Sequence, residues 1–287
     1  TLTLLNGTNL YRKSSSGGLG YTSGSGFYVM GSVNTDVINI YYDVAGSVTE
    51  NKELTPSTAN CNANLIITSG TNLTPSGSRT VNNLTNSGTL TIGANFTANQ
   101  NVTLNNGILT DGGSGKSFRF FGNLTGSGTH IGTGLGSLLR LYGDNKIISG
   151  NFIVDSFSIE KTNTNNTLLT SYTLSSSTNL TINKDLLLSG SLNDGGNIVT
   201  VKGSIIGIGT HTGTGKIKMT GVAKKIISNG TGFFANINNL EIASGASLSA
   251  CETYFTGNLL MNGGDITMIS GDTTVFKNGS SINRNSG

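Results

Sequence analysis

From about residue 64 onward, the chain is built from short runs in which apolar and polar residues alternate, and Gly, Asn and Ser separate these runs. Typical runs span residues 65–68, 89–92, 198–201 and 265–269, and Thr, Val, Ile and Leu dominate them. A period of two places every second side chain on the same face of a β-strand. Because no segment of ten or more residues shows the i, i+3, i+4, i+7 spacing of an amphipathic helix, we expect almost no helix.

The alternating runs belong to a longer repeat. The segment Gly126-Ser127-Gly128-Thr129-His130-Ile131-Gly132-Thr133-Gly134 returns as Gly207-Ile208-Gly209-Thr210-His211-Thr212-Gly213-Thr214-Gly215, an offset of 207 − 126 = 81 residues. A second landmark, Lys146-Ile147-Ile148-Ser149-Gly150, returns as Lys225-Ile226-Ile227-Ser228-Asn229, an offset of 225 − 146 = 79. A third, incomplete copy spans residues 257–280. The period is therefore about 80 residues, as in proteins built from structural repeats.

These patterns predict an all-β chain that forms a right-handed parallel β-helix, or β-solenoid. Strands start every 8 to 12 residues, and a unit of about 80 residues divides into about four coils of roughly 20. Asn, Ser and Thr recur where successive coils could stack them into side-chain ladders. The alternative is an array of β-sandwiches with hairpins, since pairs such as Asn106-Gly107 and Asp194-Gly195 suit hairpin turns as well as solenoid corners.

Composition divides the chain into two parts. Residues 1–63 form an atypical N-terminal β segment with most of the tyrosines and expected strands at residues 1–5, 27–33 and 37–42. We interpret it as a cap or as the first coils, with a separate small β-domain as the alternative. Residues 64–287 form the repetitive solenoid, about 11 coils and about 50 Å long, which we expect to continue in a longer polypeptide.

Charge and cysteine content exclude several kinds of function. The 17 basic and 14 acidic residues give a net charge of +3, too small for a nucleic-acid partner. No run approaches the roughly 18 apolar residues of a membrane helix, so we expect no membrane insertion. Cys61 and Cys251 lie 251 − 61 = 190 residues apart, about nine coils, which places them far beyond the roughly 7 Å of a disulfide. We therefore predict two unpaired cysteines.

Several motifs share features with sites for a nucleotide, a metal ion or catalysis. The segment Asp111-Gly112-Gly113-Ser114-Gly115-Lys116-Ser117 resembles a phosphate-binding loop only at its end, and we interpret it as a corner. His130 and His211 occupy the same repeat position, which favours a structural role at a corner. Asp111, Asp194 and Asp265 each lie beside a Gly-Gly pair and are expected to cap turns, since one carboxylate per repeat cannot bind calcium.

Two acidic pairs are close in sequence: Asp36 with Asp43, and Glu50 with Glu53. A polysaccharide-cleaving site needs two acids within about 10 Å of each other. Because no cluster of His, Arg or aromatic residues supports either pair in the sequence, we expect neither to be catalytic. The sequence thus predicts no catalytic residue, no cofactor-binding residue, no metal ligand and no enzyme activity.

The repeat texture carries a resemblance to a known class of proteins. The phrases Asn83-Leu84-Thr85-Asn86-Ser87-Gly88-Thr89-Leu90-Thr91-Ile92, Asn179-Leu180-Thr181-Ile182-Asn183-Lys184-Asp185-Leu186-Leu187-Leu188 and Asn239-Leu240-Glu241-Ile242-Ala243-Ser244-Gly245-Ala246 resemble the repeats of very long surface proteins of Bacteroidetes. The resemblance covers roughly residues 64–287 and involves no catalytic motif. It implies a secreted, cell-surface adhesin or gliding-motility filament protein that uses the type IX secretion machinery, although no C-terminal sorting domain is visible in this sequence.

The leading hypothesis is therefore a non-catalytic extracellular module that forms a stiff rod. Its Thr, Ser and Asn faces would bind surface glycans or a solid substratum weakly and multivalently. A β-helical polysaccharide-active enzyme or phage-tail depolymerase is the alternative, and it would need clustered carboxylates in a groove. A third hypothesis, an ice-binding face, is disfavoured because Thr1-Leu2-Thr3, Thr89-Leu90-Thr91 and Thr212-Gly213-Thr214 are irregularly spaced. The oligomeric state has no signal in the sequence.

Overall fold

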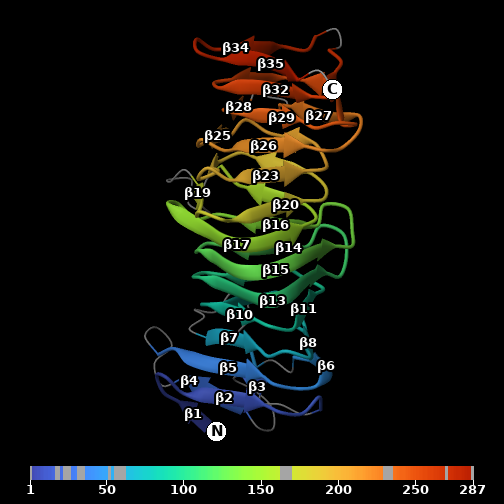
Figure 1. Cartoon of the computed structure of the whole chain (residues 1–287). Helices are drawn as coiled ribbons and strands as arrows, with labels where there is room; N and C mark the ends of the chain where they lie inside the picture. Colours follow the sequence, from blue (N-terminus) through green and yellow to red (C-terminus); the bar gives the residue numbers. More distant parts are fainter. Residues whose placement is uncertain are drawn as a thin grey trace. The chain divides into compact units, whose positions relative to one another are not determined.

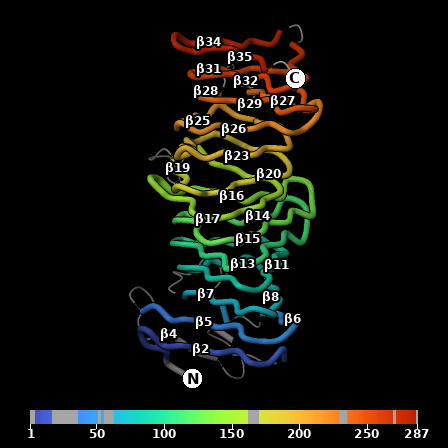
Figure 2. The backbone as a smooth tube through the Cα atoms, viewed as in Figure 1, coloured from blue at the N-terminus to red at the C-terminus, as the bar shows by residue number. Residues whose placement is uncertain are grey.

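The computed structural model describes residues 2–16, 20–21, 27–30, 36–50, 53–54, 63–161, 170–228, 235–268 and 271–285. Within these ranges all regular structure is β-strand, and the strands stack as a parallel β-solenoid of about 11 turns (Figures 1 and 2). The predicted parallel all-β architecture is confirmed. The sandwich alternative is wrong, because the described strands pair in parallel, whereas hairpins would pair them antiparallel.

The chain divides into two compact units, Thr1–Leu139 and Arg140–Gly287. Strand β16 (Leu138–Leu141) contains the boundary between them. The first unit contains β1 (Leu2–Leu4), β2 (Asn9–Arg12), β3 (Gly20–Tyr21), β4 (Phe27–Met30), β5 (Ile38–Tyr42), β6 (Gly46–Thr49), β7 (Ala63–Ile67), β8 (Thr71–Thr74), β9 (Arg79–Val81), β10 (Leu84–Asn86), β11 (Thr89–Ile92), β12 (Phe96–Ala98), β13 (Val102–Asp111), β14 (Ser117–Phe120) and β15 (Leu124–Gly132).

The second unit contains β17 (Lys146–Val154), β18 (Phe157–Ile159), β19 (Ser171–Leu174), β20 (Asn179–Ile182), β21 (Leu186–Leu188), β22 (Ser191–Asn193), β23 (Ile198–Val201), β24 (Ile205–Ile206), β25 (Thr210–Thr212), β26 (Lys216–Met219), β27 (Lys224–Ile227), β28 (Ala235–Ile237), β29 (Leu240–Ile242), β30 (Ser247–Cys251), β31 (Thr253–Phe255), β32 (Asn258–Asn262), β33 (Asp265–Ile266), β34 (Thr274–Phe276) and β35 (Ser281–Asn285).

A typical turn supplies three strands in succession, such as β10, β11 and β12. The first two pair with neighbouring turns in one large sheet, and the third pairs in a smaller sheet. Strands β5 and β6 pair in parallel with β7 and β8, so residues 38–49 belong to the same stack as the repeats that follow.

The core consists of columns of apolar side chains that stack in register. The inward-facing positions of β7, β10, β13 and β15 form one such column, whose members are fully buried: Leu65, Leu84, Val102 and Leu124. Outward-facing neighbours such as Thr85, Thr103 and Thr125 are polar and half-buried, which explains the period of two seen in the sequence. Burial of these columns is the main stabilising contribution, at about 25 cal/mol per Å² of apolar surface.

The Asn-Gly and Asp-Gly pairs lie at bends of the parallel coil. Left-handed backbone occurs at Gly7, Asn106, Gly195 and Gly263, with φ values of 78°, 59°, 58° and 74°. Asn106 lies inside β13, where the register with β15 shifts by one residue. The pairs therefore bend the chain within or between parallel strands, as the solenoid interpretation predicted.

A ladder of asparagines runs along the first unit, which confirms the predicted stacking of polar side chains. Asn39 donates to Asn9, Asn64 donates to Asn39, and Asn83 donates to Asn64, each through its amide Nδ2 over 2.8 to 2.9 Å. The ladder continues through backbone N–H groups of the next two turns, at Asn101 and Asn123. Each turn thus satisfies polar groups of the turn before it.

The glycines of the repeated motif are explained by close contact between turns. A Cβ added at Gly128 would collide with the Leu104 side chain and the Gly107 carbonyl oxygen. A Cβ at the equivalent Gly209 would collide with the carbonyl oxygens of Gly190 and Leu188. Only a residue without a side chain fits at this position in either copy.

Cys251 is buried at the end of β30 and has a free thiol. Burial raises its pKa to about 11, so the thiol stays protonated and unreactive. Cys61 lies outside the described residues. The prediction of two unpaired cysteines is therefore confirmed for Cys251 and stays a prediction for Cys61.

We expect Gly209→Ala to lower the free energy of unfolding by about 1–3 kcal/mol, because the new methyl group meets rigid backbone of the preceding turn. The matched control is Gly113→Ala, since nothing lies within 4 Å of a Cβ built there. Chemical denaturation followed by circular dichroism measures both. Equal stability of the two variants would contradict the close stacking of turns.

Candidate functional site

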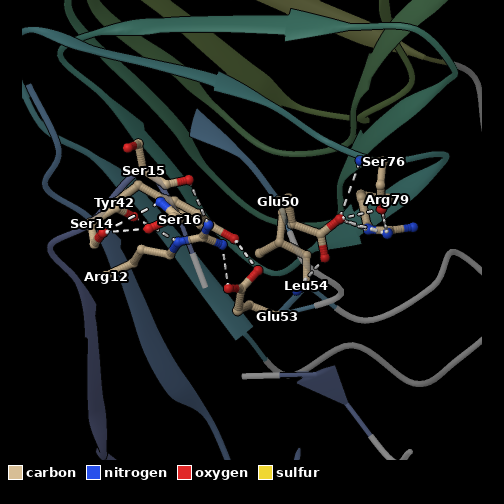
Figure 3. Close-up of polar contacts among 10 residues, drawn as sticks. All are labelled: Arg12, Ser14, Ser15, Ser16, Tyr42, Glu50, Glu53, Leu54, Ser76 and Arg79. Atoms are coloured by element: carbon tan, nitrogen blue, oxygen red, sulfur yellow. Dashed lines mark hydrogen bonds and ion pairs between the residues drawn. The ribbon is translucent and has the colours of Figure 1, made fainter. Parts of the chain in front are cut away.

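Five buried polar side chains lie close to one another in the first unit and form what we call the arginine–glutamate cluster: Arg12, Tyr42, Glu50, Glu53 and Arg79 (Figure 3). Arg12 and Tyr42 end strands β2 and β5, and Arg79 begins β9. The two glutamates lie in the segment after β6. All five are at most 8% exposed.

Glu53 is held from two sides. Arg12 Nη1 lies 2.5 Å from Glu53 Oε1, and the Tyr42 hydroxyl donates to Glu53 Oε2 over 3.1 Å. The remaining guanidinium donors of Arg12 bind the backbone carbonyl oxygens of Ser14 and Ser15. The ion pair therefore anchors the segment after β2 and the segment after β6 to each other.

Glu50 is also fully engaged. Its Oε2 accepts from Arg79 Nε at 3.1 Å and Nη2 at 2.6 Å, and from the backbone and hydroxyl of Ser76. Its Oε1 accepts from the backbone N–H of Leu54 at 3.0 Å. A guanidinium that binds one carboxylate through two donors is a strong, oriented contact.

The charges of the cluster balance, because two guanidinium groups face two carboxylates. Burial raises the pKa of Tyr42 well above its ordinary value, and the nearby Glu53 and Glu50 raise it further, so the hydroxyl remains a donor. A pocket of about 190 Å³ borders the cluster, lined among others by Tyr11, Lys13 and Glu53. Every oxygen of Glu50 and Glu53 already accepts a hydrogen bond, which favours a structural role over proton transfer.

This cluster corrects the expectation that no Arg or aromatic residue supports the Glu50 and Glu53 pair. The supporting residues are distant in sequence: Arg12 is 41 residues from Glu53, and Arg79 is 29 from Glu50. Asp43, a member of the other acidic pair, is half-buried and pairs with Lys13, which holds the pKa of Asp43 below its usual range.

A second feature occurs twice, once in each unit. His130 Nε2 lies 3.0 Å from Asp111 Oδ2, and His211 Nε2 lies 3.0 Å from Asp194 Oδ2. All four side chains are at most 1% exposed. Because a carboxylate only accepts, the His130 ring donates its Nε2 proton to Asp111.

The two histidines lie in strands, so the prediction that they occupy corners is wrong. His130 continues an apolar column in which it stacks on Leu109, and Leu109 stacks on Leu90. His211 stacks between Leu192 and Ile237. The structural role that we expect from the recurrence of the two histidines remains a prediction. The aspartates support it, because each one holds its histidine in place inside the core.

Asp194 also confirms the predicted capping of turns by aspartate. Its Oδ1 accepts from the backbone N–H groups of Gly196 and Gly215, each over 2.8 Å. Burial by itself raises the pKa of Asp194, but contact with His211 and these two N–H groups together lower it below the ordinary value. In contrast, Asp265 is exposed at the start of β33.

The loop with the Gly-Lys-Ser ending is a corner, as expected. It joins β13 to β14, and Gly115 has a left-handed φ of 70°. Strand β14 begins at Ser117, whose backbone N–H is bound by the side chain of Asn95. A strand at this place lacks the N-terminal N–H groups with which a helix binds phosphate.

The described part of the chain contains no group of three or more His, Cys, Asp or Glu side chains arranged to bind a metal ion. Over the same residues, no helix has the length and apolar character needed to cross a bilayer. Comparison of the chain with protein-family models, curated proteins and solved structures finds no match.

We expect Glu50→Gln to destabilise the first unit by about 3–5 kcal/mol, because it leaves the buried Arg79 guanidinium without its counter-charge. The double variant Glu50→Leu/Arg79→Met removes both charges and should cost much less. Denaturant unfolding of the three proteins tests this difference. If the single variant were no less stable than the double variant, the ion pair would not be a structural support.

The lowered pKa of Asp194 predicts a stabilising contribution that is fully present above about pH 4 and is lost as the pH falls through the folded-state pKa. Asp194→Asn should therefore flatten the fall in the free energy of unfolding between about pH 5 and pH 2. Asp265→Asn, at the exposed aspartate, should leave the profile unchanged. Identical acid profiles for wild type and Asp194→Asn would contradict this account.

Proposed function

We propose that this chain is a non-catalytic structural and adhesive module of a large bacterial surface protein. Its solenoid forms a stiff support outside the cell, and its outward polar faces bind glycans or a solid surface weakly and at many points. The resemblance of the repeat texture to that of Bacteroidetes surface proteins supports export through the type IX machinery and a role in adhesion or gliding motility.

The observation that carries this proposal is the regular display of polar groups on the outward faces. Thr85, Thr103 and Thr125 stack in register on three successive turns, and the hydroxyls of the last two lie 3.1 Å apart. Parallel strands repeat such a row about every 4.8 Å. A surface of this kind offers the same hydrogen-bonding groups again and again, which suits multivalent binding.

The hydrogen bonds and ion pairs of the buried Glu50 and Glu53 carboxylates support a non-catalytic role over catalysis. Cleavage of a polysaccharide needs one carboxyl group that gives a proton and another that attacks or activates water. In the arginine–glutamate cluster both carboxylates are engaged by guanidinium groups, a hydroxyl and backbone donors. Their arrangement holds three segments of the backbone together.

A glycan array probed with the whole chain tests the proposal. We expect weak binding as a monomer and binding about 10²–10⁴-fold stronger when many copies are displayed on a bead, because display makes the contacts multivalent. The bound glycans should be recovered intact, with no new reducing ends. Absence of binding in both formats would contradict the adhesive role, and release of shortened glycans would favour the depolymerase alternative.

A further inference from the structure

A groove of about 410 Å³ lies on the outward face of the second unit. Its lining comes from five strands that stack one on the next in Figure 1: β23, β26, β29, β32 and β35. The groove therefore runs across the strands, over a span of about 19 Å at 4.8 Å per turn. This direction and length fit an extended chain better than a compact small molecule.

The groove combines apolar and polar groups. Ile198 is 47% exposed, and the half-buried Leu260 lies in the same lining. Asn258, Asn283 and Thr214 add exposed polar side chains. An apolar surface flanked by amides and a hydroxyl matches a sugar ring, which has C–H faces and hydroxyl edges.

Some of these polar atoms are occupied within the protein, and others are available. Asn258 Oδ1 accepts from the Ser281 hydroxyl at 2.6 Å, and Asn283 Nδ2 donates to the same hydroxyl at 3.0 Å. Within the described ranges, Asn258 Nδ2 and Asn283 Oδ1 are left without a protein partner. The internal hydrogen bonds hold each amide in place while one donor and one acceptor remain available to a ligand.

The groove also carries a positive charge. Lys216 Nζ lies 2.5 Å from Glu241 Oε2, and Lys218 Nζ lies 3.2 Å from Glu241 Oε1. Burial alone raises the pKa of Glu241, but the two lysines and Asn262 lower it below its ordinary value, so the carboxylate is ionised. Two ammonium groups share one carboxylate, which leaves one positive charge unbalanced beside the groove. Lys216 and Lys218 are 31% and 35% exposed, so a ligand can reach them.

We propose that this groove binds an extended acidic polysaccharide, with sugar rings against Ile198 and Leu260 and a sugar carboxylate against Lys216 and Lys218. The inference rests on the proposed adhesive function and specifies the ligand class and the site. Charge complementarity selects the acidic glycan over a neutral one. The line of five turns selects a polymer, because polar side chains follow one another along it on three of the turns: Lys216, Asn258 and Asn283.

The test uses the whole chain, with a linear oligogalacturonate hexamer as the acidic probe and cellohexaose as the neutral one. Titration calorimetry measures the Kd for wild type and three variants. Lys216→Gln removes a groove charge, and Asn258→Asp keeps the acceptor for Ser281 but adds a negative charge. Lys225→Gln is the matched control, because this exposed lysine lies in β27, in the smaller sheet. Circular dichroism confirms that each variant is folded.

We expect oligogalacturonate to bind wild type and Lys225→Gln equally, and to bind Lys216→Gln and Asn258→Asp at least about tenfold more weakly. Cellohexaose should bind more weakly than oligogalacturonate, and its affinity should not change with Lys216→Gln.

Equal binding of the two probes, or equal weakening by Lys225→Gln and Lys216→Gln, would overturn the acidic-groove proposal. If oligogalacturonate did not bind although the array showed other bound glycans, this proposal would fail and the adhesive function would stand. If the array showed no glycan at all, the proposed function itself would fail.

Discussion

The in-register stacking of each turn on the one before is the constraint on which the rest of this structure depends. Because the strands are parallel and aligned, side chains at register partners meet between one turn and the next. Inward positions form apolar columns, and outward positions form polar ladders such as the one that begins at Asn9 and Asn39. The same constraint excludes a side chain at Gly128 and Gly209, where a Cβ would collide with atoms of the preceding turn.

The buried charged side chains of this stack lie against partners of opposite character. The arginine–glutamate cluster satisfies two carboxylates with two guanidinium groups, and the histidine–aspartate pairs place an imidazole and a carboxylate inside otherwise apolar columns. A buried ion pair contributes little net stability compared with apolar residues of the same size, but the loss of one partner costs several kcal/mol. These groups therefore define which segments must come together.

Much of the fold could be predicted from the sequence, because the period of two reflects strands with one face in the core and the repeat of about 80 residues divides into whole coils. The arginine–glutamate cluster could not, since Arg12 and Glu53 belong to the least repetitive part of the chain and no period relates them. The histidine–aspartate pairs did leave a signal. The spacings 130 − 111 = 19 and 211 − 194 = 17 are each close to one coil, so each histidine lies one turn after its aspartate.

The most direct test of parallel, in-register stacking is cross-linking between pairs of introduced cysteines, with Cys61 and Cys251 replaced by Ala. Thr103 and Thr125 are register partners on adjacent turns, whereas Thr103 and Thr110 lie in the same strand, on opposite sides of the bend at Asn106 and at most about 23 Å apart. A short thiol-specific cross-linker should join Thr103→Cys to Thr125→Cys rapidly and leave the pair Thr103→Cys and Thr110→Cys unlinked. No cross-link between positions 103 and 125 in the folded protein would contradict the solenoid.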